Sequence, residues 1–308
     1  MNYTLHQLQV FLRVVHTKSI TRAAEELYMT QPAVSIQLKN FQDQFEIPLT
    51  EVIGRQLRVT DFGHEIAAMA QRVLDEVQAI NHRTQTYKGL LSGRLKIVSV
   101  STGKYVMPFF LSPFLAQHPG IELTLDVTNK QRVTESLESG EVDFALVSVL
   151  PKADVAEEKL LENWLYLVGN NSNNWPVSRQ PVSILKDMPL IYREPGSATR
   201  AVMEAFLEKK KLKERKRIEL TSNEAVKQAV IAGLGYSVMP LIGIRHELRS
   251  GELQLIPVTG LPLRSDWRLI WLKQKKLPPA ALAYLEFIRS EKAAIRRNTF
   301  GWATRKPL

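Results

Sequence analysis

Residues 19–45 read SITRAAEELYMTQPAVSIQLKNFQDQF. Apolar residues recur at helical spacing in two parts of this stretch: Ile20, Ala24 and Leu27 in the first part, and Val34, Leu38, Phe41 and Phe45 in the second. Residues three or four apart share one face of a helix, so each set predicts a helix with one side in the core. Thr30 is a suitable N-cap for the second helix, and Pro32 fits its first turn. The stretch therefore predicts two helices joined by a tight turn.

The second helix keeps a polar surface after its apolar side is assigned to the core. This surface is formed by Gln31, Pro32, Ser35, Ile36, Gln37, Lys39 and Asn40. Amide and hydroxyl groups can hydrogen-bond base edges, a lysine can meet a phosphate, and free N–H groups at a helix start favour anions. We interpret the stretch as a helix-turn-helix whose second helix reads the major groove of DNA. The alternative is an ordinary helical hairpin with a solvated face.

The residues themselves favour the DNA-binding interpretation. Ala23-Ala24, Leu27, residues 30–35 (TQPAVS) and Leu38 resemble the DNA-binding domain of LysR-type transcriptional regulators. The chain departs from the usual family residues at Ile36 (usually basic), Phe41-Gln42 (Leu-Glu), Phe45-Glu46 (Leu-Gly) and Thr50 (Phe). Ile36 bears most on base preference, because an apolar side chain can touch a thymine methyl but cannot donate to a guanine.

Two short extended segments follow, residues 47–53 and 56–59, on either side of Gly54-Arg55. They predict a wing whose Arg55 and Arg58 reach the DNA backbone or the minor groove. The alternative is that both are ordinary surface arginines. The complete set of predicted DNA contacts is Thr21, Arg22, Gln31, Pro32, Ser35, Ile36, Lys39, Arg55 and Arg58.

Residues 61–90 predict a linker helix that begins after the cap residue Thr60. Ile66, Val73, Ile80 and Tyr87 recur every seven residues, with Met69, Ala70 and Val77 between them. A single helix cannot hide such a stripe, so we expect it to form a dimer, although packing on its own domain is the alternative. A two-fold dimer presents two recognition helices to an inverted-repeat operator in double-stranded DNA. The LysR resemblance implies the same pairing and, commonly, a homotetramer.

From residue 91 onward the pattern alternates between strands and helices. Strands are expected at 95–101, 121–127, 142–147, 190–192, 218–220, 236–239 and 267–271, and helices at 105–118, 131–139, from 197, 224–232 and 279–289. Two α/β lobes joined by crossing strands are typical of periplasmic binding proteins and of the LysR effector domain. We therefore predict an N-terminal, mainly α winged helix-turn-helix (1–60), the linker helix (61–90) and a two-lobed α/β effector-binding domain (91–300). Its lobe I comprises 94–165 plus 267–298, and its lobe II comprises 166–266.

Ligands of open α/β sheets bind beyond the carboxyl ends of the strands, where helix N-termini converge. The polar residues expected at those ends are Ser101, Thr102, Lys104, Thr128, Asn129, Ser148, Ser197, Thr199 and Arg200. Hydroxyls, N–H groups and cations together predict a small anionic effector, a carboxylate or a phosphate. The alternative for each single Ser or Thr is a helix cap. Residues 101–105 (STGKY) also resemble the LysR-type regulators of carbon-fixation operons, whose effectors are phosphorylated or carboxylated metabolites.

Composition excludes several other classes of protein. The chain has 308 residues, a formal charge of +10 and no cysteine, which fits a nucleic-acid partner in a reducing cytoplasm. Much of the positive charge lies in residues 209–217 and 289–306, where a solvated helix face or tail is the simpler interpretation. The amphipathic N-terminus is unlike a signal peptide, and residues 106–116 are too short and interrupted to cross a membrane. Six scattered histidines and the missing nucleophile and phosphate-loop motifs predict no catalysis, no metal and no cofactor.

We therefore expect a cytoplasmic transcriptional regulator that responds to a ligand. Effector binding would change the arrangement of the two lobes, the spacing of the paired DNA-binding heads, DNA bending and contact with RNA polymerase. The alternative is a cytoplasmic solute-binding or sensor protein without a DNA role.

Overall fold

The structure is a computed structural model that describes residues 2–54, 56–86, 91–173, 175–212 and 217–304. It divides into two compact units, Met1–Gly93 and Arg94–Leu308.

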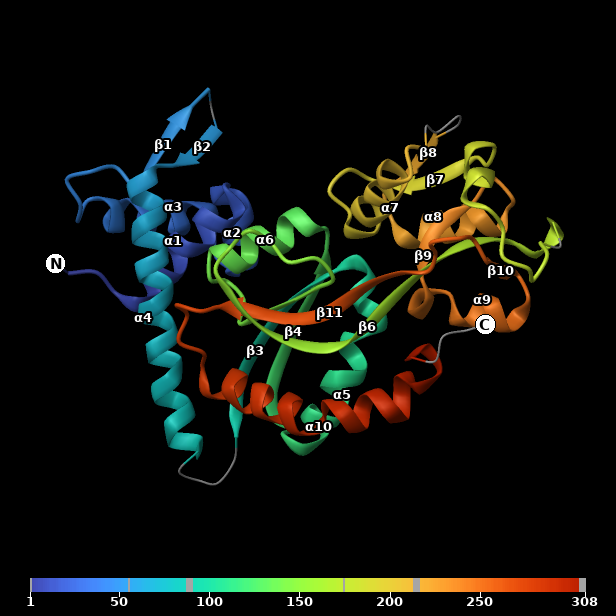
Figure 1. Ribbon diagram of the computed structural model, residues 1–308. Coiled ribbons are helices and arrows are strands. Elements are labelled where there is room, and N and C mark those ends of the chain that lie inside the picture. The colour runs from blue at the N-terminus through green and yellow to red at the C-terminus, as the bar shows by residue number, and fades with distance from the viewer. Residues whose placement is uncertain (1, 55, 87–90, 174, 213–216, 305–308) are drawn as a thin grey trace. The chain divides into compact units, whose positions relative to one another are not determined.

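The first unit contains the helix-turn-helix and its wing (Figure 1). Its elements are α1 (Leu5–Thr17), α2 (Ile20–Glu26), α3 (Gln31–Gln42), β1 (Thr50–Ile53), β2 (Gln56–Val59) and α4 (Asp61–Thr86). The hydroxyl of Thr4 caps α1 together with the side chain of Gln7, and Ser19 caps α2. Thr60 Oγ1 accepts from Gly63 N across 2.9 Å, which confirms the cap predicted for α4. Thr30 occupies the N-cap position of α3, but its side chain makes no capping hydrogen bond.

The core of the first unit explains the apolar spacing of residues 19–45. Val34, Phe41 and Ala23 are fully buried, and Phe11 of α1 packs on Phe41 with their ring centroids 5.1 Å apart. Ile20, Ala24 and Leu27, and Val34, Leu38 and Phe41, therefore face the core as predicted, whereas Phe45 packs against it from beyond the end of α3 at Gln42.

The stripe predicted along α4 is only partly correct. Ala70 is buried in the core of the first unit, and Ile66 packs against the same core. Met69, Val73 and Ile80 have 51%, 45% and 67% of their surface exposed. An α-helix has 3.6 residues per turn, so residues at 62, 66, 70 and 74 form an inward row beside the exposed one. Tyr87 and the side chains of 78, 79 and 81–86 lie outside the described residues.

The second unit is organised around a sheet of order β10-β6-β11-β5-β3-β4, with β9 also paired to β6. Its strands are β3 (Ser92–Val100), β4 (Gly120–Thr128), β5 (Phe144–Val147), β6 (Val155–Asn170), β9 (Ser237–Pro240), β10 (Leu253–Ile256) and β11 (Leu263–Leu272). Strands β3 and β5 are parallel, whereas β11 runs antiparallel to both β5 and β6. A separate parallel pair is formed by β7 (Leu190–Arg193) and β8 (Arg217–Leu220).

The long strands β6 and β11 run through both lobes (Figure 1). Residues 155–165 of β6 pair with β11, and residues 165–170 pair with β9 and β10. Lobe I holds β3, β4 and β5, and lobe II holds β7, β8, β9 and β10. This confirms the two-lobed architecture with crossing strands, although β6 was not predicted as a strand.

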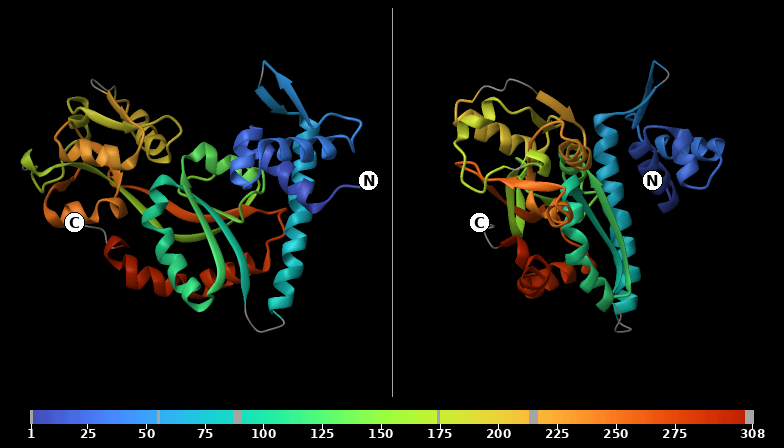
Figure 2. Two further views of the ribbon diagram at one scale, coloured as in Figure 1. Left: turned by 180° about the vertical axis from the view of Figure 1, so that it is seen from behind. Right: turned by 90° about the vertical axis from the view of Figure 1, so that its right-hand side faces the viewer.

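Helices cover the sheets of both lobes. They are α5 (Met107–Gln117), α6 (Lys130–Glu138), α7 (Ala198–Lys209), α8 (Asn223–Ile231), α9 (Arg245–Ser250) and α10 (Pro279–Thr304), with 3₁₀ turns η1 (Ser101–Tyr105), η2 (Asn171–Asn173), η3 (Val182–Lys186) and η4 (Leu241–Gly243). Helices α5 and α10 lie together on one side of the lobe I sheet, and α6 lies on the other (Figures 1 and 2).

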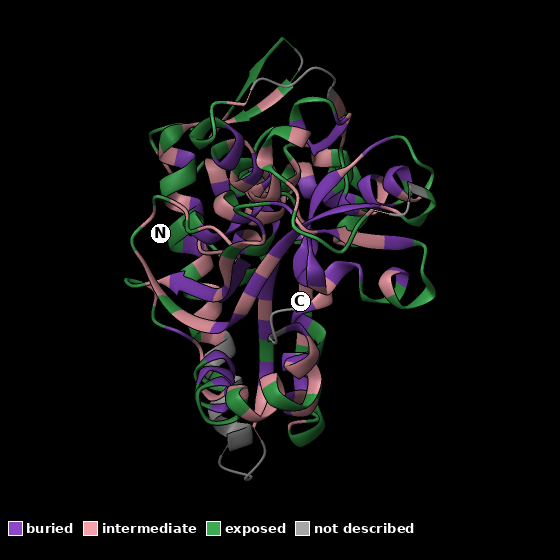
Figure 3. Cartoon of the chain, turned by 45° about the vertical axis from the view of Figure 1, so that its right-hand side comes forward, coloured by how far each residue is buried: buried purple, intermediate pink, exposed green. Residues whose placement is uncertain are grey.

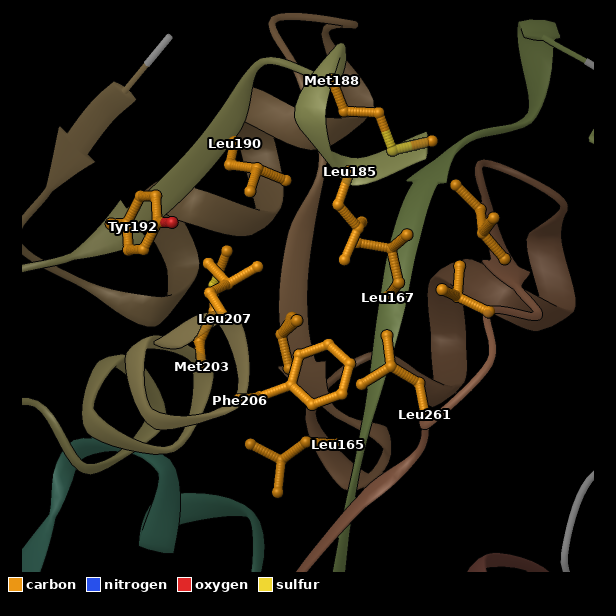
Figure 4. Packing of buried hydrophobic residues seen from close by; sticks show 13 residues of the cluster. Leu165, Leu167, Leu185, Met188, Leu190, Tyr192, Met203, Phe206, Leu207 and Leu261 are labelled. Carbon is orange, nitrogen blue, oxygen red and sulfur yellow. The ribbon is translucent and has the colours of Figure 1, made fainter. Parts of the chain in front are cut away.

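Each lobe has a buried interior (Figure 3). In lobe II, Met203, Phe206 and Leu207 of α7 belong to one buried cluster with Leu165 and Leu167 of β6 (Figure 4). In lobe I, Phe114 of α5 packs edge-on against Tyr284 of α10, with their ring centroids 5.1 Å apart. These cores hold the polar strand ends in place.

Helix α10 is longer than predicted. Its apolar spacing predicts a helix over 279–289, but the helix continues to Thr304. Phe300 stacks on Phe110 of lobe I, and Trp302 and Ala303 pack in the core cluster of lobe II. The charged residues between 289 and 297 conceal these later apolar contacts in the sequence. No helix within the described ranges is long and apolar enough to cross a membrane.

Candidate functional site

A small polar cavity lies where strand ends from the two lobes meet. Its lining from lobe I is Val100, Ser101, Thr102, Thr128, Asn129 and Lys130, and its lining from lobe II is Arg193, Glu194, Ser197, Ala198 and Thr199. The cavity measures about 20 Å³. That is room for about one water molecule. An anion of several atoms therefore requires side chains or lobes to move.

Helix starts surround this cavity. Helix α6 begins at Lys130 and α7 begins at Ala198, so both present free backbone N–H groups there. Asn129 Oδ1 accepts from Arg132 N and acts as the cap of α6. Ser197 is the N-cap of α7, but its side chain makes no capping hydrogen bond. Two positive helix ends with available hydroxyls suit an anionic oxygen.

Arg193 is the buried cation of this cavity, and the sequence analysis missed it. It is the last residue of β7, and 5% of its side chain is exposed. Its Nε and Nη2 atoms donate to Glu194 across 2.7 and 2.8 Å. Nη2 also donates to Ser101 Oγ of lobe I across 3.1 Å. An arginine that ends an apolar strand at its carboxyl edge is the signal that could have identified it.

The structure brings most of the predicted effector residues together. Those that line the cavity are Ser101, Thr102, Thr128, Asn129, Ser197 and Thr199. Lys104, Ser148 and Arg200 are not in the lining.

The two predicted cations point elsewhere because carboxylates hold them. Arg200 donates to Glu204 and Glu219 across 2.8 and 2.7 Å, and to the carbonyl of Arg193 across 3.0 Å. Lys104 Nζ lies 4.0 Å from Glu224 Oε2 and 5.1 Å from the ring centre of Tyr105. Neither side chain lies in the cavity lining, so their contact with the effector stays a prediction.

A second polar contact joins the lobes near Lys104. Tyr105 of lobe I donates to Glu224 Oε2 of α8 across 3.2 Å. Lys227 lies 2.9 Å from Glu224 and 2.6 Å from Glu247. Burial alone lowers the pKa of Lys227, but its hydrogen bonds to Glu247 and Glu224 raise it above the ordinary value. Burial alone raises the pKa of Glu224, but its contacts with Lys227 and Tyr105 lower this pKa and so favour its charged form, and Glu224 holds the Tyr105 hydroxyl against lobe II.

The candidate DNA-binding face lies on the first unit. Gln31, Pro32, Ile36 and Lys39 are exposed on α3, and Ser35 is half-buried beside them. Thr21 and Arg22 are exposed on α2. Tyr28, in the turn between these helices, is 98% exposed. It was not among the predicted contacts.

The wing adds a cationic edge to this unit. Arg58 is exposed on β2. Together with Lys18 and His64 it lines an open hollow with a volume of about 730 Å³. Lys18 was not predicted as a contact. Arg55 lies outside the described residues, so its predicted contact stays a prediction. Among the residues placed by the structure, no group of three His, Cys, Asp or Glu residues could hold a metal ion.

A winged helix-turn-helix together with a two-lobed ligand-binding domain defines a ligand-responsive DNA-binding regulator. Residues 5–64 match the profile of the bacterial regulatory helix-turn-helix proteins of the lysR family, and residues 88–293 match the LysR substrate binding domain. The chain belongs to the LysR family of transcriptional regulators.

The similar proteins include regulators of carbon fixation. The chain is 34% identical to the HTH-type transcriptional activator CmpR of Synechocystis over 96% of this chain and 97% of that protein. It is 36% identical to a RuBisCO operon transcriptional regulator of Allochromatium vinosum over 95% of this chain and 98% of that protein. The chain is therefore similar to the carbon-fixation subgroup over nearly its whole length.

Solved structures agree with the fold. The regulatory domain of Synechocystis CcmR, solved in complex with 2-PG, is 30% identical and has a TM-score of 0.63, covering 68% of this chain and 99% of that chain. A full-length OxyR variant of Pseudomonas aeruginosa has a TM-score of 0.70 at 23% identity, covering 96% of this chain and 95% of that chain.

Proposed function

We propose that this chain is a cytoplasmic LysR-type regulator that controls a carbon-fixation operon in response to a small phosphorylated acid such as 2-phosphoglycolate. The observation that supports the ligand is the cavity between the lobes, where Arg193, the starts of α6 and α7, and the hydroxyls of Thr102 and Ser197 meet. Positive helix ends and an arginine favour a phosphate. The relationship to CcmR, whose regulatory domain was solved with 2-PG, supports the same class of ligand.

The proposed DNA contacts are the exposed face of α3, Thr21 and Arg22 of α2, and Arg55 and Arg58 of the wing. Gln31 and Ser35 would meet base edges, and Lys39 a phosphate. The exposed row Met69, Val73 and Ile80 of α4 supports a dimer, which would bind an inverted repeat. The same proposal includes assembly into a tetramer, contact with RNA polymerase, and domain boundaries at residues 60 and 90.

The alternative function, a sensor without a DNA role, does not fit the match of residues 5–64 to the lysR-family helix-turn-helix. Against it stand the uncommitted polar face of α3 and the exposed Tyr28 beside it, which a solute-binding protein does not need.

The test is a mobility-shift titration with the purified full-length protein and the DNA upstream of its own gene, with and without 2-phosphoglycolate. We expect 2-phosphoglycolate to change the affinity or the footprint. Thr102→Val should keep DNA binding and lose the response, because Thr102 is buried in the cavity lining. Thr124→Val, on the exposed side of β4, is the matched control and should respond as the native protein does. A full response from Thr102→Val would remove this residue from the site.

A further inference from the structure

The charge of Arg193 is already matched inside the cavity. Glu194 is the next residue in the chain, and its two carboxylate oxygens take the Nε and Nη2 atoms of Arg193. Among the described residues, the further hydrogen bond of this guanidinium is the one to Ser101 Oγ. An incoming anion that uses Arg193 must therefore share it with Glu194 or displace Glu194.

The carboxylate of Glu194 can move out of its ion pair with Arg193 because part of this side chain reaches solvent. Its side chain is 20% exposed, whereas that of Arg193 is 5% exposed. The carboxylate can therefore turn toward solvent while the guanidinium stays in the cavity. Arg193, by contrast, is fixed by both lobes, through Ser101 and through the backbone of β7.

The displacement discriminates between classes of anion. A monocarboxylate offers one charge and two oxygens, the same chemistry that Glu194 already supplies. Glu194 is also tethered to its partner, so its effective concentration is on the order of millimolar or higher. A free monocarboxylate therefore gains little by replacing it. A phosphate carries a charge of about −2 near neutral pH and has three oxygens, which Arg193, the starts of α6 and α7, and nearby hydroxyls can share.

We propose that Glu194 is a specificity-determining residue: by occupying Arg193, it excludes monocarboxylates and admits ligands that bear a phosphate dianion. This inference rests on the proposed function, since it concerns the same cavity. No covalent step is involved. The phosphate exchanges with a carboxylate on one guanidinium, and the carboxylate moves into water.

The experiment is isothermal titration calorimetry of the full-length protein with three probes: 2-phosphoglycolate, inorganic phosphate and glycolate. The native protein should bind 2-phosphoglycolate much more tightly than glycolate. Glu194→Gln keeps the shape of the side chain and removes its charge. It should raise the affinity for glycolate at least about tenfold and reduce the difference between the affinities for glycolate and for 2-phosphoglycolate. Glu204→Gln is the matched control, because Glu204 pairs with Arg200 outside the cavity. It should behave like the native protein.

A double-mutant cycle shows whether Glu194 acts through Arg193. In an Arg193→Gln background, Glu194→Gln should bring no gain for any probe. An equal gain in that background would mean a general charge effect and would overturn the proposal. A thermal melt of each variant identifies those that fail to fold, and Glu194→Ala then provides a second test of the same charge.

The outcomes separate this inference from the proposed function. Binding of 2-phosphoglycolate by the native protein with an unchanged glycolate affinity in Glu194→Gln would overturn only the role of Glu194. Binding of none of the three probes by either protein would overturn both the proposed ligand and the role of Glu194.

Discussion

Arg193 Nη2 of lobe II donates a hydrogen bond to Ser101 Oγ of lobe I across 3.1 Å. The two residues lie 92 positions apart in the chain and belong to different lobes. The bond can therefore form only when the two lobes are close together at the cavity. Both residues line the proposed ligand cavity.

Ser101→Ala should destabilise the second unit by about 1 kcal/mol, because a typical intramolecular hydrogen bond contributes that much. Arg193 keeps Glu194 as its partner, so the loss should stay small. Chemical denaturation of the purified protein, compared with Ser112→Ala on the exposed side of α5, provides the measurement. A loss above about 3 kcal/mol, on the order of leaving a buried charge unpaired, would mean that Ser101 does more than accept this bond.

Lys39→Ala should weaken operator binding and random-sequence binding to similar extents. A lysine that neutralises one phosphate releases about one counterion, so the slope of log affinity against log salt should fall by about 1. Filter binding at several salt concentrations measures this slope. Lys276→Ala, which removes the same charge from the second unit, should leave the slope unchanged.

Gln31→Ala should instead weaken specific binding selectively. A side chain that reads a base edge contributes about 1–3 kcal/mol of discrimination, so affinity for the operator should fall while non-specific binding stays the same. Selection of binding sites from a randomised operator should show relaxed preference at one position. A uniform loss on all sequences would assign Gln31 to the backbone instead.

Val73→Glu should dissociate the dimer. Val73 is 45% exposed in the row with Met69, and a charge there would have to be buried between two copies of α4. Sedimentation should show a smaller species, and operator affinity should fall with it. Arg72→Glu, an exposed neighbour on the same helix, is the control for a charge change alone. Unchanged mass in Val73→Glu would exclude this row as the interface.

The contact between Tyr105 and Glu224 should weaken in acid. Burial alone raises the pKa of Glu224, but its hydrogen bond to Lys227 and the charge of Lys227 lower it below the ordinary value of 4.5. A carboxyl group with a lowered pKa stabilises the folded state above its ordinary pKa, and this stabilisation disappears as the pH falls through the folded value. The melting temperature should therefore fall less between about pH 7 and pH 3.5 in Glu224→Gln than in the native protein. Equal falls would exclude Glu224 from the acid response.

Much of the fold could be predicted because local chemistry determines it. Helix α3 begins at the predicted Thr30–Pro32 signal, and α4 begins after the predicted cap Thr60. Strand β6 could not be predicted in the same way. Glu157 and Glu158 interrupt its apolar pattern, and their partners, such as Arg268 and Arg289, lie more than a hundred residues away.

The candidate site was also only partly predictable from the sequence. Strand order predicted which loops meet, so six of the nine effector residues line one cavity. The direction of long side chains could not be predicted, because it depends on partners brought by folding. Glu219 of β8 holds Arg200 away from the cavity, while Arg193, which directly follows the strand predicted at 190–192, lines it.

Helix α10 makes the two lobes mechanically dependent on each other. It packs on lobe I at Tyr284 and on lobe II at Ala303, so it is a third crossing alongside β6 and β11. Two strands alone would let the lobes rotate freely. A helix that packs on both lobes must slide or bend when they rotate. A rotation of the lobes against each other would therefore have to change the packing of Phe300 on lobe I or of Trp302 and Ala303 on lobe II.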